Sequence, residues 1–218
     1  NNEHICLSFD DALKCQLDIA IPILEERNLD AFFFIYTSPL MGEPDFLEVY
    51  RYFRTVKYSD ISLFYKDFFN SLEQQYQSLF QKSKEEFDEE SYLSDFPFYS
   101  FDDKYFRYVR DNILDNSQYH KIMHCLFEKH SFDINKSTND LWMTPEEIKS
   151  ISDKGHVIGL HSHSHPTQLH KLTKEEQRIE YNTNYKFLTN IIKKDIISMS
   201  HPCGNYNSDT LDILEDLG

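Results

Sequence analysis

Two apolar segments joined by a helical pattern constrain the fold of this chain more than any other feature. Residues 4–9 predict a short strand that Asp10 and Asp11 end, and residues 31–36 predict a second buried strand. Between them, apolar residues recur at helical spacing as far as Asn28, and Pro22 marks either a kink or the start of the regular helix. A strand, a helix and a second strand in this order are typical of a parallel sheet or barrel.

The same alternation returns toward the C-terminal end of the chain. Thr144, Pro145 and Glu147 predict a helix start, because they supply an N-cap, a first-turn proline and a capping box, and Gly155 predicts its end. The following segments are expected as strand, helix, strand and helix, over residues 156–160, 172–193, 196–200 and 209–217. Gly218 suits the C-cap of the last helix.

Between these two parts, the strand pattern disappears. Residues 42–141 are rich in Tyr, Phe, Glu, Asp and Lys and show only helical patterns, over residues 46–55, 60–82, 103–113 and 117–130. We therefore predict a core made of residues 1–41 and 142–218, interrupted by a mainly helical insertion at 42–141. Such an insertion either covers a site, makes a partner surface or is a passive extension of the core.

The charge of the chain narrows the range of partners. The sequence holds 37 acidic and 22 basic residues, giving a net charge of -15. An acidic chain is repelled by phosphate backbones and anionic lipids, so we expect no nucleic-acid partner and no electrostatic docking on membranes.

The sequence also lacks a run of apolar residues long enough to span a bilayer. The four cysteines form no C-x-x-C pair, which favours reduced thiols over a disulfide framework. The oligomeric state is left open.

Polar clusters follow three of the predicted strands, at residues 10–11, 161–165 and 201–204. In parallel α/β folds, the carboxyl ends of the strands meet at one edge, and that edge collects active-site groups. Three clusters in equivalent positions indicate a functional site more strongly than any one of them, since an acidic pair alone suits a helix N-terminus equally well.

The histidines in the second cluster favour a metal. His161, His163 and His165 lie within five residues, and any two of them could join Asp11 in a set of two histidines and one carboxylate. Imidazole nitrogens suit Zn, Fe, Ni or Co, and an open coordination position is what a catalytic metal needs. Such a metal acidifies water and polarises a carbonyl group, and Asp10 is placed to take the proton of that water.

A second histidine pair competes with this assignment. His120 and His124 are spaced four residues apart on a predicted helix and Cys125 follows, which superficially resembles a metalloprotease helix. Lys121 stands where the metalloprotease glutamate belongs, and no third ligand is evident. We favour a structural role for this pair.

The motifs as a group resemble those of the NodB-type polysaccharide deacetylases, carbohydrate esterase family 4. Ser8-Phe9-Asp10-Asp11 is similar to the family's T-F-D-D motif, and His161 to Pro166 is similar to its H-[ST]-x-x-H-P motif. Residues 155–160 and 31–34 resemble the strands that precede family motifs. The third motif appears in altered form as His201-Pro202-Cys203-Gly204. The resemblance covers about residues 4–40 and 142–218.

The resemblance implies a fold, a reaction and roles for the residues. The fold would be a distorted (β/α) barrel, incomplete at its C-terminus. Asp10 would be the general base, and Asp11, His161 and His165 would bind a divalent metal, most plausibly Zn, with Co or Ni as alternatives, leaving His163 without a role in the metal site. The substrate would be an N-acetylated sugar in a glycan or glycan precursor. The stretch His201, Pro202, Cys203 and Gly204 would line the acetyl group. A cytoplasmic enzyme of polysaccharide biosynthesis fits these implications.

The chain departs from the family pattern in two places. His201 and Cys203 replace an Arg or Tyr and an aromatic residue, and where the family has Arg it steadies the base, which His201 could do only when suitably protonated. The family's later Leu-x-His motif, whose His protonates the leaving amine, has no counterpart before Gly218, and we expect further residues to supply it. Two other functions stay open, a non-catalytic carbohydrate-binding relative and a metallohydrolase of another class, such as a phosphoesterase.

Overall fold

The computed structural model describes residues 5–138 and 141–218. The chain forms two compact units: unit 1 is Asn1–Asp45 with Thr138–Gly218, and unit 2 is Phe46–Ser137. The elements of unit 1 are β1 (Ser8–Asp10), η1 (Gln16–Ala20), α1 (Ile21–Glu26), β2 (Phe32–Ile35), η2 (Pro39–Met41), α8 (Pro145–Asp153), β3 (Val157–Leu160), η4 (Leu169–Lys171), α9 (Lys174–Ile192), η5 (Pro202–Gly204) and α10 (Ser208–Leu217). Those that begin in unit 2 are α2 (Phe46–Lys57), α3 (Ile61–Gln75), α4 (Gln77–Glu86), α5 (Phe101–Tyr108), η3 (Val109–Ile113), α6 (Asn116–Lys129) and α7 (Ile134–Thr138).

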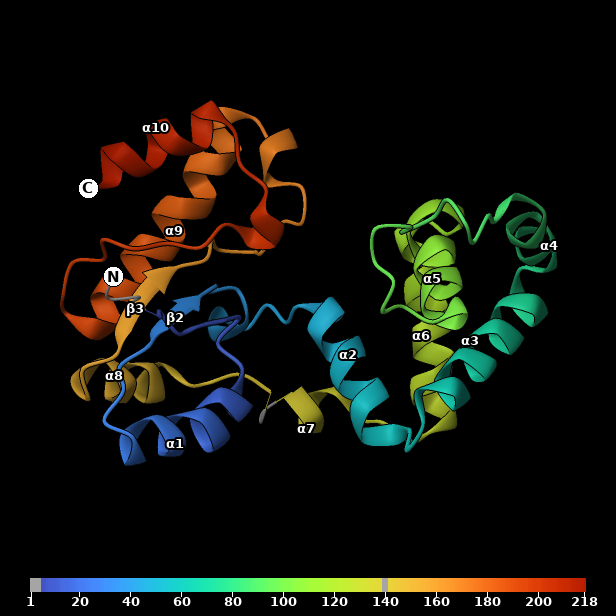
Figure 1. The fold of residues 1–218 in the computed structure, drawn as a ribbon, viewed down its shortest axis with the longest axis horizontal. Coiled ribbons are helices and arrows are strands. Elements are labelled where there is room, and N and C mark those ends of the chain that lie inside the picture. Colours follow the sequence, from blue (N-terminus) through green and yellow to red (C-terminus); the bar gives the residue numbers. More distant parts are fainter. Residues whose placement is uncertain (1–4, 139–140) are drawn as a thin grey trace. The chain divides into compact units, whose positions relative to one another are not determined.

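The described part of unit 1 is built on a three-stranded parallel sheet in the order β1-β2-β3 (Figure 1). The register pairs Asp10 with Phe34 and Ile35 with Leu160, so the carboxyl ends of the strands meet at one edge. Gly159 is required in β3, because a Cβ there would lie 2.4 Å from the Phe34 ring and 2.8 Å from the Ser198 hydroxyl. The sheet therefore delivers the residues that follow each strand to a common edge.

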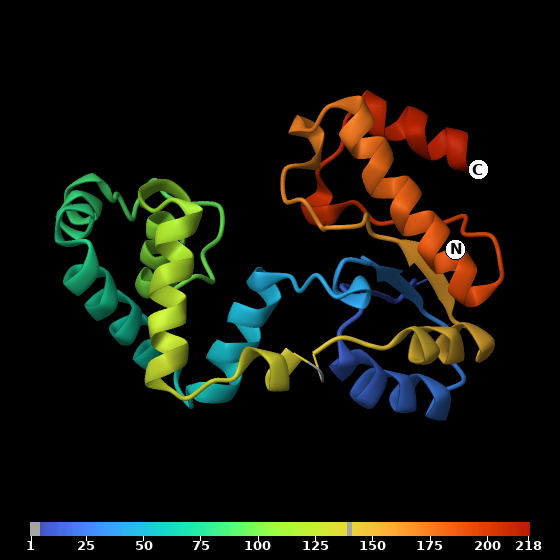
Figure 2. The ribbon, with the colours of Figure 1, turned by 180° about the vertical axis from the view of Figure 1, so that it is seen from behind.

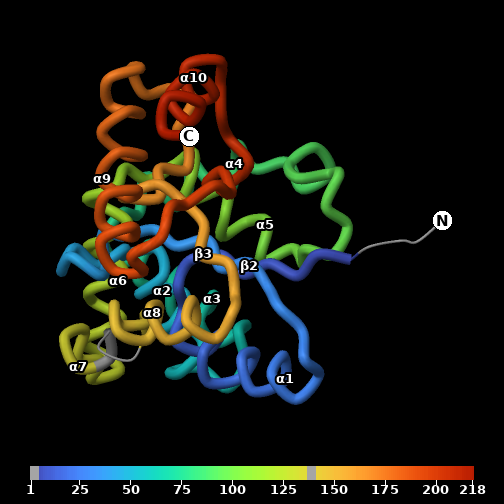
Figure 3. Tube along the Cα trace, turned by 90° about the vertical axis from the view of Figure 1, so that its left-hand side faces the viewer, coloured from blue at the N-terminus to red at the C-terminus, as the bar shows by residue number. Residues whose placement is uncertain are grey.

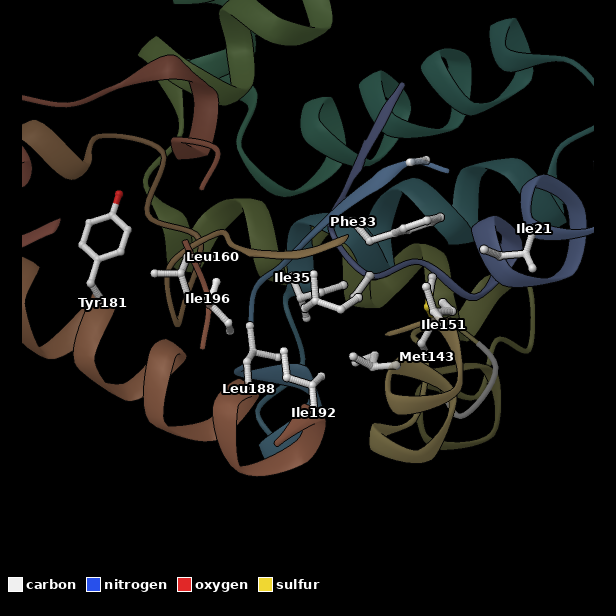
Figure 4. Close-up of a cluster of buried hydrophobic side chains, with 14 of the residues drawn as sticks. Ile21, Phe33, Ile35, Met143, Ile151, Leu160, Tyr181, Leu188, Ile192 and Ile196 are labelled. Carbon is white, nitrogen blue, oxygen red and sulfur yellow. The ribbon is translucent and has the colours of Figure 1, made fainter. Parts of the chain in front are cut away.

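The core of unit 1 joins the sheet to its helices. Phe33 and Ile35 of β2 are fully buried. Figure 4 shows Ile35 among Leu188 and Ile192 of α9, with Ile151 of α8 nearby. Seen from behind, α9 crosses β3 (Figure 2), and α10 packs against α9 (Figure 3). Burial of these side chains, each contributing roughly 1.5–3 kcal/mol, fixes α9 against the sheet.

The caps in unit 1 confirm several predicted helix ends. Thr144 accepts a hydrogen bond from the Glu147 N–H in a capping box at the start of α8. Thr173 caps α9 in the same way, and Lys193 ends it in a left-handed conformation. The regular helix α1 starts next to Pro22, after the π-helical segment η1, which resolves the alternative left open by the sequence.

Two predicted strands differ from the structure. The first is shorter than residues 4–9, since β1 begins at Ser8, and residue 4 lies outside the described residues. The segment at 196–200 forms only a single parallel bridge, between Leu160 and Met199, and is not a strand. Its Ile197 is 84% exposed, so the apolar run that suggested a buried strand is only partly used in the core. A three-stranded sheet does not establish a closed barrel, which stays a prediction.

Helices are the only regular elements in the described residues of unit 2, and aromatic rings pack its interior. Phe53, Phe64 and Phe68 are fully buried, and Phe68 meets Phe106 edge to face with ring centroids 4.9 Å apart. The predicted helix at 60–82 is wrong as a single element. The chain leaves the helical conformation at Tyr76, so α4 continues from the end of α3 in a different direction (Figure 1).

The described helices also differ from membrane-spanning helices. Within residues 5–138 and 141–218, no helix combines the length and the apolar character that crossing a bilayer requires.

Candidate metal centre

Three loops at the carboxyl edge of the sheet hold residues with left-handed backbone. The φ angles are 77° at Asp11, 55° at Ala12, 61° at Ser162, 55° at His165 and 53° at Cys203. Residues other than glycine adopt such angles at a cost, and this kind of strain concentrates at functional sites. The shared strain marks this edge as the place to search for a site.

Asp11, His161 and His165 converge at this edge. The Nε2 atoms of His161 and His165 lie 3.4 and 3.5 Å from the Asp11 Oδ1. These residues offer ligand atoms that all lie within 4.8 Å of one another. Residue 11 and residues 161–165 are far apart along the chain, and the register of the parallel sheet brings them together.

This donor set fits a divalent metal such as zinc. Zinc takes imidazole nitrogen and carboxylate oxygen at about 2.0–2.2 Å, which puts two tetrahedral ligands roughly 3.3–3.6 Å apart. The separations from Asp11 to His161 and to His165 lie in that range. A set of one carboxylate and two imidazoles also leaves coordination positions open for water and substrate.

The second ring nitrogen of His161 is held by the backbone. Its Nδ1 lies 2.8 Å from the Ser200 carbonyl oxygen, so Nδ1–H donates there and Nε2 is left to face Asp11. This second hydrogen bond is the arrangement that orients metal-binding histidines. Burial disfavours the charged ring, but the Asp11 carboxylate and the Ser200 carbonyl raise the pKa of His161 overall. A cation at Nε2, whether a proton or a metal ion, is therefore favoured.

Asp10 lies beside the cluster at the end of β1. Its Oδ2 accepts a hydrogen bond of 3.3 Å from the Ser200 hydroxyl, and the charge of Asp10 also acts on His161. The side chain is exposed. It is thus a solvent-accessible carboxylate next to the three candidate ligands, as a general base requires.

His163 is held away from the candidate ligands. Its Nδ1 lies 2.9 Å from the Thr37 hydroxyl, and its carbonyl oxygen accepts hydrogen bonds from the N–H groups of Thr37 and Ser38. The metal-ligand cluster found within the described residues does not include it. The spacing of the three histidines left their roles open, and the structure separates His163 from the other two.

Two residues of α9 hold the histidine loop, and the sequence did not identify either of them. Asn184 is fully buried; its amide donates to the Ile35 carbonyl at 2.8 Å and accepts from the His161 N–H at 3.1 Å. Glu180 accepts from the N–H groups of His163 and Ser164 at 2.9 and 2.7 Å. Their spacing of four residues is the only signal in the sequence, and polar residues at that spacing are ordinary on a solvated helix.

The third loop, Pro202–Gly204, places His201 among aromatic residues. Its ring stacks on Tyr206 with centroids 4.4 Å apart, and its Nδ1 lies 3.3 Å from the Tyr181 hydroxyl. Burial lowers the pKa of His201, and nearby His161 lowers it further. The hydrogen bond to Asp10 comes from Ser200. Pro202 is buried, whereas Cys203 and Gly204 are exposed.

The competing pair in unit 2 contacts aromatic residues. The His120 Nδ1 is hydrogen-bonded to the Tyr50 hydroxyl, and the ring meets Phe46 edge to face. The ring of His124 lies beside Phe46 and Phe127. Neither histidine belongs to a potential metal cluster in the part of the chain that the structure describes.

A parallel α/β sheet whose carboxyl edge carries an aspartate and two histidines at ligand distance defines a class of protein: an α/β protein with a candidate metal centre. The sequence pattern of one family narrows this class. The chain belongs to the polysaccharide deacetylase family, whose pattern matches residues 97–218, more than half of its length. That range includes His161, His165 and the third loop. Asp10 and Asp11 lie outside it.

The chain is similar to solved structures of several bacterial proteins. The Streptococcus pyogenes deacetylase PplD in complex with acetate is 14% identical with a TM-score of 0.50, over 100% of this chain and 54% of that one. The deacetylase domain of BpsB from Bordetella bronchiseptica is 13% identical with a TM-score of 0.50, over 98% of this chain and 61% of that one. A family 4 pseudoenzyme from Bacillus anthracis is 12% identical with a TM-score of 0.47, over 99% of this chain and 41% of that one. No curated protein matches the chain.

The chain thus spans little more than half the length of the first of these structures. At these identities the likeness supports the fold alone. The NodB-type fold is consistent with the mixture of helices and a parallel sheet in unit 1.

Proposed function

We propose that this chain carries the metal site and the general base of a metal-dependent deacetylase that acts on N-acetylated sugars. The observation that supports the proposal is the convergence of Asp11, His161 and His165 with Asp10 beside them, in a chain of the polysaccharide deacetylase family. The same reasoning keeps the distorted barrel as the proposed architecture, with residues 42–141 inserted into it.

Asp11, His161 and His165 would hold a divalent metal, for which zinc is the first choice and cobalt or nickel are alternatives. When bound, such an ion supplies Lewis acidity, which polarises the acetamide carbonyl and acidifies water. The protein contributes the orientation of the ligands. The Ser200 carbonyl fixes the ring of His161, and Asn184 fixes its backbone.

In the proposed reaction, the Asp10 carboxylate accepts a proton from water as the oxygen forms its bond to the acetamide carbon. The carbon–nitrogen bond then breaks as the leaving nitrogen takes up the proton that Asp10 received from water, which releases acetate and the free amino sugar. The hydroxyl of Ser200 donates to Asp10 and orients its carboxylate. Residues His201 to Gly204 would lie along the acetyl group, with Pro202 buried beneath them.

The test measures metal content and acetate release on the full-length protein. We expect about one equivalent of metal and release of acetate from N-acetylglucosamine oligomers. Asp10→Asn should retain the metal and lose roughly a hundredfold to ten-thousandfold in rate. His165→Ala should lose both. Asp18→Asn, which removes an exposed carboxylate of η1, is the matched control and should change neither.

Two results would overturn the proposal. One is bound metal without acetate release from any acetylated sugar, which would favour a metallohydrolase of another class. The other is full activity in Asp10→Asn, which would remove the carboxylate from its proposed role. A protein that binds no metal but still binds glycans would favour a non-catalytic relative.

A further inference from the structure

Unit 2 contains a cavity of about 520 Å³ whose lining is rich in arginine. Its lining residues lie on α2, α3 and α5 or close to these helices, all within unit 2. Arg51 and Arg54 come from α2, Tyr65 from α3, and Asp103 and Arg107 from α5. Three guanidinium groups around one cavity are unexpected in a chain with a net charge of -15.

Two of these guanidinium groups have no acceptor from the protein. Within residues 5–138 and 141–218, neither the Arg54 nor the Arg107 side chain forms an ion pair or hydrogen bond. Each stacks on aromatic rings instead. The Arg54 guanidinium lies 5.3 Å from the centroid of Phe64, and that of Arg107 lies 4.3 Å from the centroid of Tyr99. Stacking uses the flat faces of a guanidinium and leaves the N–H donors, which lie in its plane, without acceptors.

One acidic side chain, Asp103, belongs to the lining, and the charge of Arg107 contributes to the lowered pKa of Asp103, but no ion pair or hydrogen bond joins the two within the described residues. Glu48 forms its ion pair with Arg51 and not with Arg54 or Arg107. The Asp103 carboxylate accepts hydrogen bonds from the Tyr65 hydroxyl and from Ser100. Burial lowers the pKa of Arg54, and the charges of Arg51 and Arg110 lower it further. A half-buried cation of this kind is costly unless an anion joins it.

We propose that this cavity binds a phosphate group through Arg54 and Arg107. Guanidinium groups pair with phosphate through two parallel hydrogen bonds, and several arginines around one cavity favour a group of more than one negative charge over a carboxylate. The cavity is larger than a phosphate ion, so it accommodates either the free ion or the phosphate group of a phosphorylated sugar. The site is separate from the metal centre and does not depend on the proposed deacetylation.

The test titrates chelator-treated protein with inorganic phosphate, with N-acetylglucosamine 1-phosphate and with acetate, by calorimetry. We expect phosphate to bind and acetate not to bind. Arg54→Gln and Arg107→Gln should each weaken phosphate binding roughly tenfold or more. Arg107→Lys keeps the charge but loses the two-pronged geometry, so it should give a smaller loss. Arg178→Gln removes an arginine that pairs with Asp216 in unit 1 and should have no effect.

The outcomes separate the explanations. Equal binding of the ion and the sugar phosphate assigns the cavity to the phosphate alone, and tighter binding of the sugar phosphate assigns it to a phosphorylated sugar. Absence of binding up to about 10 mM phosphate overturns the proposal. So does an equal loss in Arg178→Gln, equal binding of acetate, or binding that appears only when metal is restored. Circular dichroism identifies a variant that fails to fold, and Arg107, which is only half-buried on α5, then provides the independent test.

Discussion

The two units of this protein bury polarity in opposite ways. In unit 1, directional hydrogen bonds join buried polar groups at the carboxyl edge: Asn184 joins Ile35 to His161, and the Ser200 carbonyl accepts from the Nδ1–H of His161. In unit 2, aromatic rings fill the interior, and Arg54 lies among them without an acidic partner. Directional hydrogen bonds thus position the candidate metal centre in unit 1. In unit 2, the packing of aromatic rings holds the helices together and leaves the positive charge of Arg54 available to a ligand.

Metal removal should produce the largest contrast between the units. Dialysis against a chelator should lower acetate release by more than about a hundredfold, because a metal contributes several kcal/mol to charge stabilisation. The helical signal of unit 2 should not change, since the metal ligands all belong to unit 1. Zinc should restore activity. Activity that survives complete removal of metal, checked by elemental analysis, would contradict the assignment of the centre.

Phe68→Ala should give the largest loss of stability in unit 2. Phe68 is fully buried and packs against Phe64 and Phe106, so its removal leaves a cavity that costs about 3–5 kcal/mol. Denaturant unfolding measures the loss, and metal content should remain at the wild-type level. Phe98→Ala is the matched control, because Phe98 is 72% exposed and its loss should cost about 0.5 kcal/mol or less. Similar losses for the two variants would argue against the described packing.

Asn184→Ala tests the directional bonds of unit 1. It removes an amide that serves Ile35 and His161, which should cost roughly 1–3 kcal/mol of stability. Because the same amide positions His161, metal affinity should also fall, by roughly tenfold to a hundredfold. Competition with a fluorescent chelator measures the affinity. Asn190→Ala, an exposed position on the same helix, should leave both quantities unchanged. Loss of stability without loss of affinity would limit Asn184 to a structural role.

The smallest effect is expected at Asp67 of unit 2. Burial opposes its ionisation, but hydrogen bonds from Lys129, His130 and Tyr58 lower the pKa of Asp67 below its ordinary value. A depressed pKa in the folded state adds stability above the unfolded pKa of about 3.9, and this stability is lost as pH falls through the folded pKa.

Asp67→Asn should therefore cost about 1 kcal/mol or less at neutral pH, because Lys129 is mostly exposed and the pair is screened. The difference from wild type should shrink below pH 4. Unfolding measured from pH 7 to pH 3 checks the sign. A difference that grows as pH falls would show that Asp67 does not have a depressed pKa.

The sequence predicted the parts of the fold that depend on local pattern. The strand-helix-strand unit, the capping box at Thr144, and the polar clusters after the strands all follow from neighbouring residues. The turn at Tyr76 does not, because it depends on packing between α3 and α4. The roles of Asn184 and Arg54 could not be predicted from local pattern either. Each occupies a helix position that looks solvated in the sequence, and only the tertiary fold reveals what surrounds it.

The roles of the candidate ligands were predicted from family resemblance and not from spacing. Spacing left three histidines equivalent, and the separation of His163 from His161 and His165 depends on hydrogen bonds from Thr37 and to Glu180. Those partners lie on other elements, so no local pattern could have selected among the histidines. The roles themselves remain to be tested by the variants described above.

The spacing of Glu180 and Asn184 has a consequence for how this protein can change. Both lie on α9, about one turn apart, and one contacts the backbone of His163 while the other contacts that of His161. The distance between these two positions along the helix therefore determines where the backbone of His161 and that of His163 are held. Inserting a single residue at 181–183 would rotate one contact away from the other by about 100°. Helix α9 can accept many substitutions on its outer face, but its length between these two positions is fixed by the loop that it holds.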